Sequence, residues 1–372
     1  MTDYLSVQGR TFDKFCVIQH ASPDCGFFAL VTTVLNSIRV ALKNNWLPVV
    51  NLDRQVSDYF YDAAHGENIW DYYFEPVMQL SYETLAKLVE AKQVDSALVH
   101  TFNDRSRVNQ ILRPDDLDSI SHFGRFDNPA EMAEWMTRKR VLGRAYVAKY
   151  VHVKPHISSI VEAFYSRHLQ AFHTYGVHIR GTDFGYAEPT SPETYFRAIQ
   201  ERVSKDRKDN IRIFLATDQE QFVDSFRHEF GSMLVTYASM RSRSEVAPFQ
   251  FKQASPYRKG EDVLVDALLL AKCGFLFKCA SAVGEYAMYF NPALECHDFA
   301  LDSRWDPSHS APASLKLNVN RLPPVLWRTA LIYKSLKRHV LDGVIGLGRR
   351  ILPQQLRDWL WMRIGRFVYF FK

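Results

Sequence analysis

The sequence of 372 residues contains only five cysteines, and no two of them form a C-x-x-C pair. A disulfide framework and a thiolate zinc site are therefore not predicted. The first residues lack the apolar core of a secretory signal, and the longest uncharged apolar run near the start, residues 27–38, is shorter than the about 20 residues that span a membrane. These absences argue against a secreted disulfide-rich domain and against a membrane-spanning protein, and they predict a cytoplasmic location.

The sequence also lacks a strong net charge: it has 46 basic and 41 acidic residues, which gives a net charge of +5. The last 42 residues carry nine of the basic side chains and only two aspartates, so the first 330 residues hold 37 basic and 39 acidic side chains. The body of the protein is therefore nearly neutral. This balance argues against nucleic acid as a partner.

The sequence does contain a repeated alternation of strand and helix patterns. In the first part, a strand is predicted over residues 15–18, a helix over residues 27–43 and a second strand over residues 46–50. In the second part, strands are predicted at residues 176–179, 211–216, 233–236 and 274–277, and helices at residues 192–203, 219–230, 262–271 and 285–290. Strands that alternate with helices predict parallel sheets.

Two further helices, over residues 129–149 and 155–173, are predicted where the two parts meet. Alternating halves of this size predict an α/β protein with two facing Rossmann-like domains. We place the first domain at residues 1–152, the second at residues 153–325 and a helical tail at residues 326–372.

Three segments between these elements leave alternatives open. The loop at residues 20–26 either points free backbone N–H groups at a ligand or only connects its neighbours, and it has no G-x-G-x-x-G motif. The aromatic segment at residues 68–76 either lines a sugar cleft or packs in the core, which is the more frequent role. The acidic segment at residues 114–118 resembles a metal-binding motif, but proline followed by aspartate also begins helices, and we favour the helix. No metal site is predicted.

One stretch, V-H-I-R-G-T-D-F-G-Y-A-E at residues 177–188, runs from a strand pattern into polar and small residues. Arg180 follows the strand, at the edge where open α/β sheets bind ligands. Its guanidinium has the shape to donate to two phosphate oxygens. Asp218, Asp266 and the turn Ser281–Gly284 belong to neighbouring elements of the same half, so we expect them to converge with Arg180. Such donors and carboxylates suit a nucleoside diphosphate.

Four segments resemble the GT-B fucosyltransferases, which include core α1,6-fucosyltransferases, nodulation-factor fucosyltransferases and, more distantly, protein O-fucosyltransferases. The segments are V-H-I-R-G-T-D at residues 177–183, F-L-A-T-D at 214–218, D-V-L-V-D-A-L-L-L-A-K-C at 262–273 and S-A-V-G-E-Y-A at 281–287. Their order and spacing agree over roughly the C-terminal half, up to Pro292. The resemblance implies a GT-B-like fold and an inverting glycosyltransferase that uses GDP-fucose without a metal cofactor.

The resemblance also implies a donor site. Arg180 would contact the β-phosphate of GDP-fucose and stabilise the departing diphosphate, where charge develops in the transition state. Asp266 would bind the guanine or ribose end, Asp218 would organise the cleft below the nucleotide, and Ser281 would donate to a phosphate. The predicted donor-binding residues are His178, Arg180, Asp218, Asp266, Ser281, Ala282 and Val283.

Three residues, Arg180, Asp183 and Glu188, are predicted to be catalytic. Glu188 lies where the α1,6 enzymes have a carboxylate proposed as the general base that takes the proton of the acceptor hydroxyl. Simpler alternatives remain for several residues: Arg180 and Asp183 form only a local ion pair, His178 is a packed strand residue, and Asp218 caps the next helix.

The chain departs from the α1,6 enzymes at two positions of the phosphate site. Those enzymes carry a second arginine where this chain has Gly181, and a lysine where it has Phe184. Another cation is therefore expected to complete the site, with Arg258 and Lys259 as candidates.

The tail has apolar residues at helical spacing between residues 354 and 372, with arginines at the flanks. This pattern is typical of a helix on an anionic membrane surface, and a helix packed on the body is the alternative. Together these patterns predict transfer of fucose from a GDP-sugar to a glycan or lipid-linked saccharide at the inner membrane face. GDP-mannose as donor, and a nucleotide-binding protein without turnover, are the alternatives.

Overall fold

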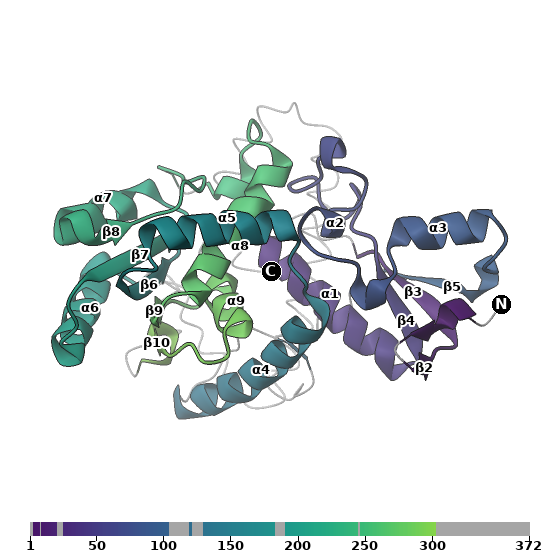
Figure 1. Ribbon diagram of the computed structural model, residues 1–372, viewed down its shortest axis with the longest axis horizontal. Coiled ribbons are helices and arrows are strands. Elements are labelled where there is room, and N and C mark those ends of the chain that lie inside the picture. Colours follow the sequence, from purple (N-terminus) through teal and green to yellow (C-terminus); the bar gives the residue numbers. More distant parts are fainter. Residues whose placement is uncertain are drawn as a thin grey trace, which may run out of the picture. The chain divides into compact units, whose positions relative to one another are not determined.

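The computed structural model describes residues 3–7, 9–20, 25–103, 119–120, 129–182, 190–244 and 246–302, and all of them belong to one structural unit (Figure 1). Two parallel sheets form the framework of this part. The first has the order β4-β3-β5 and the second the order β10-β9-β6-β7-β8. The predicted α/β class with parallel sheets in both halves is therefore confirmed.

The first sheet is built around the strand–helix–strand unit that the sequence predicts. Its strands are β3 (Lys14–Ile18), β4 (Trp46–Val50) and β5 (Val99–Phe102), and α1 (Phe27–Lys43) connects β3 to β4. α1 is buried on most of its faces, since 12 of its 17 residues are buried, among them the polar Thr32, Thr33, Asn36 and Ser37. It ends at Asn44, and the left-handed conformation of Asn45 turns the chain into β4.

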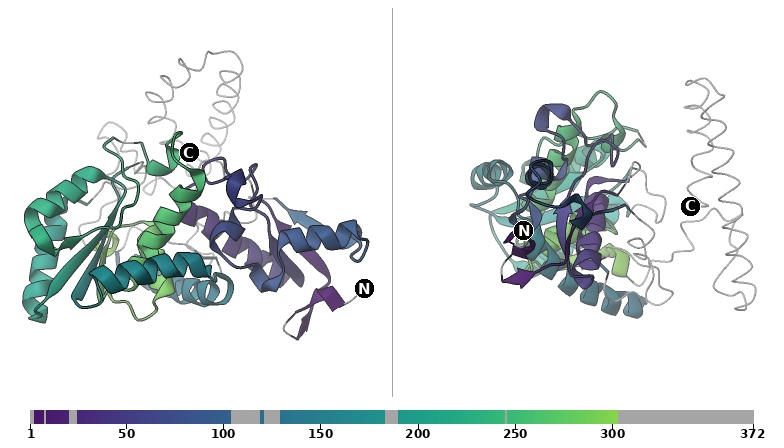
Figure 2. Two further views of the ribbon diagram at one scale, coloured as in Figure 1. Left: turned by 45° about the horizontal axis from the view of Figure 1, so that its top comes forward. Right: turned by 90° about the vertical axis from the view of Figure 1, so that its right-hand side faces the viewer.

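The second sheet carries the strand ends that form the candidate site. Its strands are β6 (His173–Ile179), β7 (Ile211–Thr217), β8 (Leu234–Val235), β9 (Phe275–Lys278) and β10 (Cys296–Asp298). The helices that accompany it are α5 (Pro155–His168), α6 (Pro192–Asp206), α7 (Glu220–Phe230), α8 (Pro256–Ala271) and α9 (Ala282–Phe290). The left view of Figure 2 shows its strands between two layers of helices.

Successive residues of the central strands point to opposite faces of the sheet, as strand geometry requires. In β7, Ile213 and Leu215 pack in a cluster with α6 and α7, whereas Phe214 and Ala216 pack in a larger cluster with α8. Helices cover both faces of the sheet, so apolar residues follow one another directly along β7 instead of alternating with polar ones. The larger cluster also contains Ile18 and residues of α1, so one core joins the first sheet to the second.

Five further strands and α-helices complete the described part. They are β1 (Ser6–Val7), β2 (Arg10–Thr11), α2 (Trp70–Tyr73), α3 (Tyr82–Glu90) and α4 (Pro129–Tyr150). The aromatic segment at residues 68–76 packs in the core, with Trp70, Tyr73 and Phe74 all buried. The core role is therefore the correct alternative for these side chains. The segment at residues 114–118 lies outside the described residues.

Candidate functional site

The carboxyl ends of β6, β7 and β9 are neighbours, because β6 pairs in parallel with both other strands. Ile179 is in register with Thr217, and His178 with Lys278. Arg180 and Asp218 directly follow the first pair. Since the turn at Ser281 follows Lys278 by three residues, the predicted groups of these three strands do come to one edge of the sheet.

Asp218 holds the backbone that follows Arg180. One carboxylate oxygen accepts from the Gly181 N–H at 2.8 Å, and the other accepts from the Thr182 N–H at 3.2 Å and from the Thr182 hydroxyl at 2.5 Å. The first residue of α7 is Glu220, and its N-cap Gln219 makes no side-chain cap. The helix-cap alternative for Asp218 is therefore wrong, since both its oxygens face the loop instead.

A side chain at position 181 would have to displace two neighbouring side chains. A Cβ atom on Gly181 would overlap the Gln219 side chain and would lie 2.5 Å from the Phe222 ring. A second arginine therefore does not fit here without displacing both side chains. Arg180 itself is half-buried, and its Nε donates to the Thr182 carbonyl at 3.5 Å.

His178 lies below this loop, in the core of the sheet. Its side chain is 5% exposed, and its Nδ1 is 3.8 Å from the Cys279 thiol. Burial lowers the pKa of His178 to about 3, and the positive charges of Arg180 and Lys278 act in the same direction. The imidazole is therefore neutral at physiological pH and is poorly suited to take up a proton.

Asp266 lies on α8 and faces the loop that follows β8. Its Oδ2 accepts from the Ser239 hydroxyl at 2.8 Å, while its Oδ1 is buried and has no partner among the described residues. Burial raises the pKa of Asp266 to about 7, against the opposing effects of Ser239 and Arg241. One turn earlier on α8, Asp262 accepts from the Met240 N–H at 2.8 Å and so fixes the same loop.

The loop after β8 contributes two residues that the sequence analysis missed, Ser239 and Arg241. Arg241 donates to the Tyr237 carbonyl at 2.6 Å, and its Nε is buried without a hydrogen-bond partner in the described part of the chain. The polar run Y-A-S-M-R-S-R-S directly follows the predicted strand at residues 233–236. A polar run directly after a strand lies at the edge where open α/β sheets bind ligands, and this position could have identified Ser239 and Arg241 from the sequence.

Ser281 is the N-cap of α9, but its hydroxyl makes no cap bond and has no partner among the described residues. The side chain is completely buried. Ala282 and Val283 form the first turn of the helix, where backbone N–H groups remain available to an acceptor. An acceptor such as a phosphate oxygen would satisfy both the hydroxyl and these N–H groups.

A second polar group lies behind this turn and was also missed. Lys278 contacts Glu285 at 2.7 Å and Asp298 at 2.8 Å, and Arg140 of α4 contacts Glu285 at 2.6 Å and Asp298 at 2.5 Å. Burial alone would raise the pKa of Glu285, but Lys278 and Arg140 outweigh it and hold the pKa below its usual range. We call these four residues the ion quartet. Arg140 is 145 positions from Glu285 and 158 from Asp298, and Lys278 meets Asp298 only because β9 pairs with β10, so no local pattern indicated the group.

The two cations considered as substitutes for an arginine at position 181 differ in their surroundings. Arg258 pairs with Glu261 at 2.7 Å and with Asp262 at 2.8 Å, so its charge is already matched. Lys259 is buried, and its ammonium group lies 6.0 Å from the centroid of the Tyr59 ring.

Several predicted features lie outside the described residues. They are Asp183, Phe184, Glu188 and the tail at residues 326–372. The general base, the alternative ion pair of Arg180 with Asp183 and the membrane-binding helix therefore stay predictions. The division into domains also stays a prediction.

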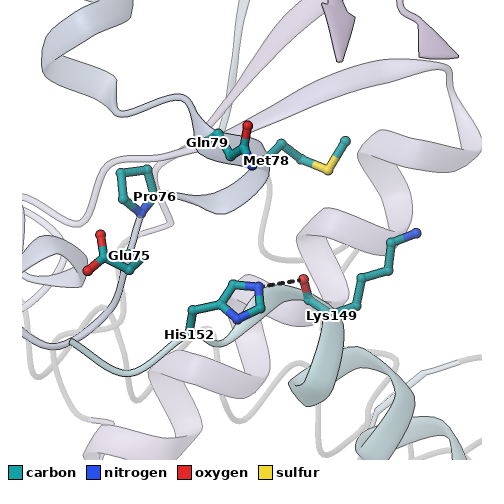
Figure 3. Close-up of a pocket in the computed structure, with 6 residues that line it drawn as sticks. All are labelled: Glu75, Pro76, Met78, Gln79, Lys149 and His152. Carbon is teal, nitrogen blue, oxygen red and sulfur yellow. Dashed lines mark hydrogen bonds between the residues drawn. The ribbon is translucent and has the colours of Figure 1, made fainter. Parts of the chain in front are cut away.

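A hollow of about 450 Å³ lies at a different place, where the segment after α2 meets the end of α4 (Figure 3). It is lined by Glu75, Pro76, Met78, Gln79, Lys149 and His152. The only hydrogen bond drawn between them joins the His152 ring to the Lys149 carbonyl at 3.1 Å. None of the predicted donor-binding residues lines this hollow.

Within the described ranges, no group of three or more His, Cys, Asp or Glu side chains is arranged to hold a metal ion. All five cysteines lie in the described part of the chain, and no disulfide joins any two of them. Of the helices that the structure describes, none is both long and apolar enough to cross a membrane.

No protein-family model and no curated protein matches the chain. Among solved structures, NodZ α-1,6-fucosyltransferase soaked with GDP-fucose is 17% identical, covers 79% of this chain and 98% of its own, and has a TM-score of 0.45. A point mutant of Arabidopsis thaliana FUT1 in complex with GDP is 13% identical over 80% of this chain and 72% of its own, with a TM-score of 0.42. POFUT1 in complex with GDP is 11% identical over 78% and 98%, with a TM-score of 0.41.

Proposed function

We propose that this chain is an inverting glycosyltransferase that transfers fucose from GDP-fucose to a hydroxyl group of a glycan. The observation that carries the proposal is the pair of buried polar atoms without partners in the described part, Asp266 Oδ1 and Ser281 Oγ, beside the strand ends that present Arg180. A buried polar atom left unpaired costs about 1–3 kcal/mol. Such a cost is tolerated where a ligand satisfies the atoms, and a nucleoside diphosphate offers both donors and acceptors.

The chemistry follows from the charges that each group carries. The Asp266 carboxylate can accept from ribose hydroxyls or from guanine N–H groups, and the Ser281 hydroxyl can donate to a phosphate. In the transfer step, the acceptor oxygen attacks the anomeric carbon of the sugar and the bond from that carbon to the β-phosphate oxygen breaks. Negative charge therefore grows on the departing GDP, where Arg180 and the first turn of α9 stabilise it.

Asp218 acts through the loop rather than on the substrate. By accepting three hydrogen bonds from Gly181 and Thr182, it fixes the conformation that presents Arg180. The acceptor proton goes to a general base, for which Glu188 is our proposal. We further propose that no metal is needed, that the acceptor is a bacterial surface or lipid-linked saccharide, and that the basic tail holds the enzyme at the inner membrane face.

Donor binding tests this proposal directly. We expect GDP and GDP-fucose to raise the melting temperature of the full chain well above the effect of UDP or ADP at the same concentration. Equal stabilisation by GDP-mannose, with mannosyl transfer, would replace fucose as the donor sugar. Stabilisation by GDP without any sugar transfer, across a panel of saccharide acceptors, would indicate the nucleotide-binding protein instead.

Substitution of Arg180 tests its assigned role in transfer. Because the guanidinium stabilises the leaving diphosphate, we expect Arg180→Ala to lower kcat by about 10²–10³-fold, the size found for a lost oxyanion donor. The control is Arg243→Ala, which removes an exposed arginine of the same half and should leave kcat unchanged. A wild-type rate for Arg180→Ala would contradict the assignment, and loss of activity in EDTA would contradict metal independence.

A further inference from the structure

Three lysines are buried among the described residues, and their ammonium groups differ in what they contact. Lys139 donates to a backbone carbonyl at 2.7 Å, and Lys278 pairs with Glu285 and Asp298. Lys259 is only 6% exposed, yet its ammonium group has no hydrogen bond or ion pair within the part of the chain that the structure describes. Nζ is not one of the fully buried polar atoms that lack a partner, so the ammonium group stays accessible from outside while its carbon chain is buried. A cation that is held in place in this way and has no acceptor in the protein is available to a ligand of opposite charge.

Lys259 points toward the first sheet, although it belongs to a helix of the second. Its Nζ lies 6.0 Å from the centroid of the Tyr59 ring, in the segment that follows the carboxyl end of β4. Lys259 and Asp266 are seven residues apart on α8, so they share one face and are separated by about 10 Å along the helix axis. One ligand with two polar ends can therefore contact both residues.

The N-terminus of α1 borders the same region. A methyl group added at Gly26, the residue that precedes α1, would contact the Phe249 ring at 4.0 Å, and that ring lies 5.3 Å from Tyr59. α1 has no side-chain cap and no acidic residue in its first turn. The partial positive charge of this helix end therefore adds to that of Lys259.

Within the described residues, no other basic side chain of α8 or of the loop after Arg180 is available to bind a second phosphate charge. Arg258 is already paired with Glu261 and Asp262, and a side chain at position 181 would have to displace two neighbouring side chains. A sugar diphosphate carries two negative charges, and one arginine leaves part of that charge unmatched. We propose that the ammonium group of Lys259 is the second cation of the donor diphosphate site, acting together with Arg180. This inference rests on the proposed function only in requiring a nucleoside diphosphate as ligand.

Calorimetric titration of the full chain with GDP and with guanosine tests this inference. We expect Lys259→Met to weaken GDP binding at least tenfold and to leave guanosine binding unchanged, because guanosine lacks the diphosphate. Lys259→Arg should stay within about threefold of wild type. The control is Lys272→Met at the end of the same helix, because Lys272 pairs with Glu162 at the surface; it should bind both ligands as wild type does.

Stability without ligand separates a binding role from a structural one. Because Lys259→Met keeps the apolar chain and removes an ammonium group that has no ion pair within the described residues, we expect its melting temperature without GDP to equal or exceed that of wild type. A lower melting temperature together with equal losses for GDP and guanosine would show that Lys259 supports the fold, and would overturn the inference. GDP binding within twofold of wild type would overturn it as well, and would point to an anionic group on the acceptor. Absence of GDP binding by the wild type would instead overturn the proposed function.

Discussion

The ion quartet and the proposed donor-binding residues at the carboxyl edge of the second sheet both contain buried polar side chains, but they differ in how completely these are paired. We call these donor-binding residues, Arg180, Asp218, Asp266 and Ser281, the donor edge. In the quartet, Lys278 and Arg140 each contact both Glu285 and Asp298. At the donor edge, Asp266 Oδ1 and Ser281 Oγ have no partner among the described residues. The two groups are joined through α9, which begins at the Ser281 turn and carries Glu285.

This difference separates residues that hold the fold from residues that are available to a ligand. Two positive and two negative side chains in the quartet balance each other, so the group is stable without any additional molecule. The donor edge lacks that balance, because the carboxylate of Asp266 and the hydroxyl of Ser281 each have an atom without a partner among the described residues. The ammonium group of Lys259, on the same helix as Asp266, has no ion pair there either. The comparison teaches that burial alone does not mark a functional residue, and that the candidate ligand-binding residues differ from the quartet in having polar groups without a partner among the described residues.

The largest expected effect comes from breaking the quartet. Lys278→Met leaves two buried carboxylates with only Arg140, so we expect the free energy of unfolding to fall by about 3–5 kcal/mol in urea denaturation. The same substitution at Lys272, which is 30% exposed and pairs with a 60% exposed Glu162, should cost less than about 1 kcal/mol. Similar losses for the two variants would remove the distinction between the quartet and a surface pair.

A smaller loss of stability is expected from substitution of Asp218, because both of its carboxylate oxygens are hydrogen-bonded to the loop after Arg180. Asp218→Asn replaces one acceptor oxygen with an NH₂ group that faces either the N–H of Gly181 or the N–H and hydroxyl of Thr182, so we expect a loss of about 2 kcal/mol. Transfer should fall more than stability, because the loop that presents Arg180 is no longer fixed. The measurement is urea denaturation beside kcat at a temperature where the variant is fully folded. Unchanged kcat would show that Asp218 serves only the fold.

The smallest effect concerns pH and the unpaired oxygen of Asp266. Burial raises the pKa of this carboxyl from its ordinary value of 3.8 to about 7, so the empty site releases its proton only as the pH rises through about 7. If the ionised form accepts hydrogen bonds from the nucleoside, GDP affinity should fall about tenfold from pH 8 to pH 6, which is about 1.4 kcal/mol. Asp266→Asn should bind GDP more weakly, without this dependence on pH. Tighter binding at pH 6 would mean that the protonated carboxyl donates instead.

The regular elements were accessible from the sequence because their signals are local. The apolar patterns predicted α1 and β4 with the bounds that the structure has. α8 begins at Pro256 rather than at residue 262, because Ser255 caps it by accepting from the Arg258 N–H at 3.3 Å. The prediction missed this start because the charged first turn has no apolar periodicity, and the polar cap was not recognised as a helix signal.

The sequence by itself determined the alternation of strands and helices, and hence the parallel sheets and the edge at which Arg180, Asp218 and Ser281 meet. These follow from periodicity and from the geometry of parallel strands, which depend on neighbouring residues. Only the tertiary structure decided that Asp218 holds the loop, that Lys278 is paired and that Lys259 has no partner among the described residues. Those outcomes depend on contacts between residues far apart in the sequence, such as Arg140 with Asp298, which are 158 positions apart, and no local pattern encodes them.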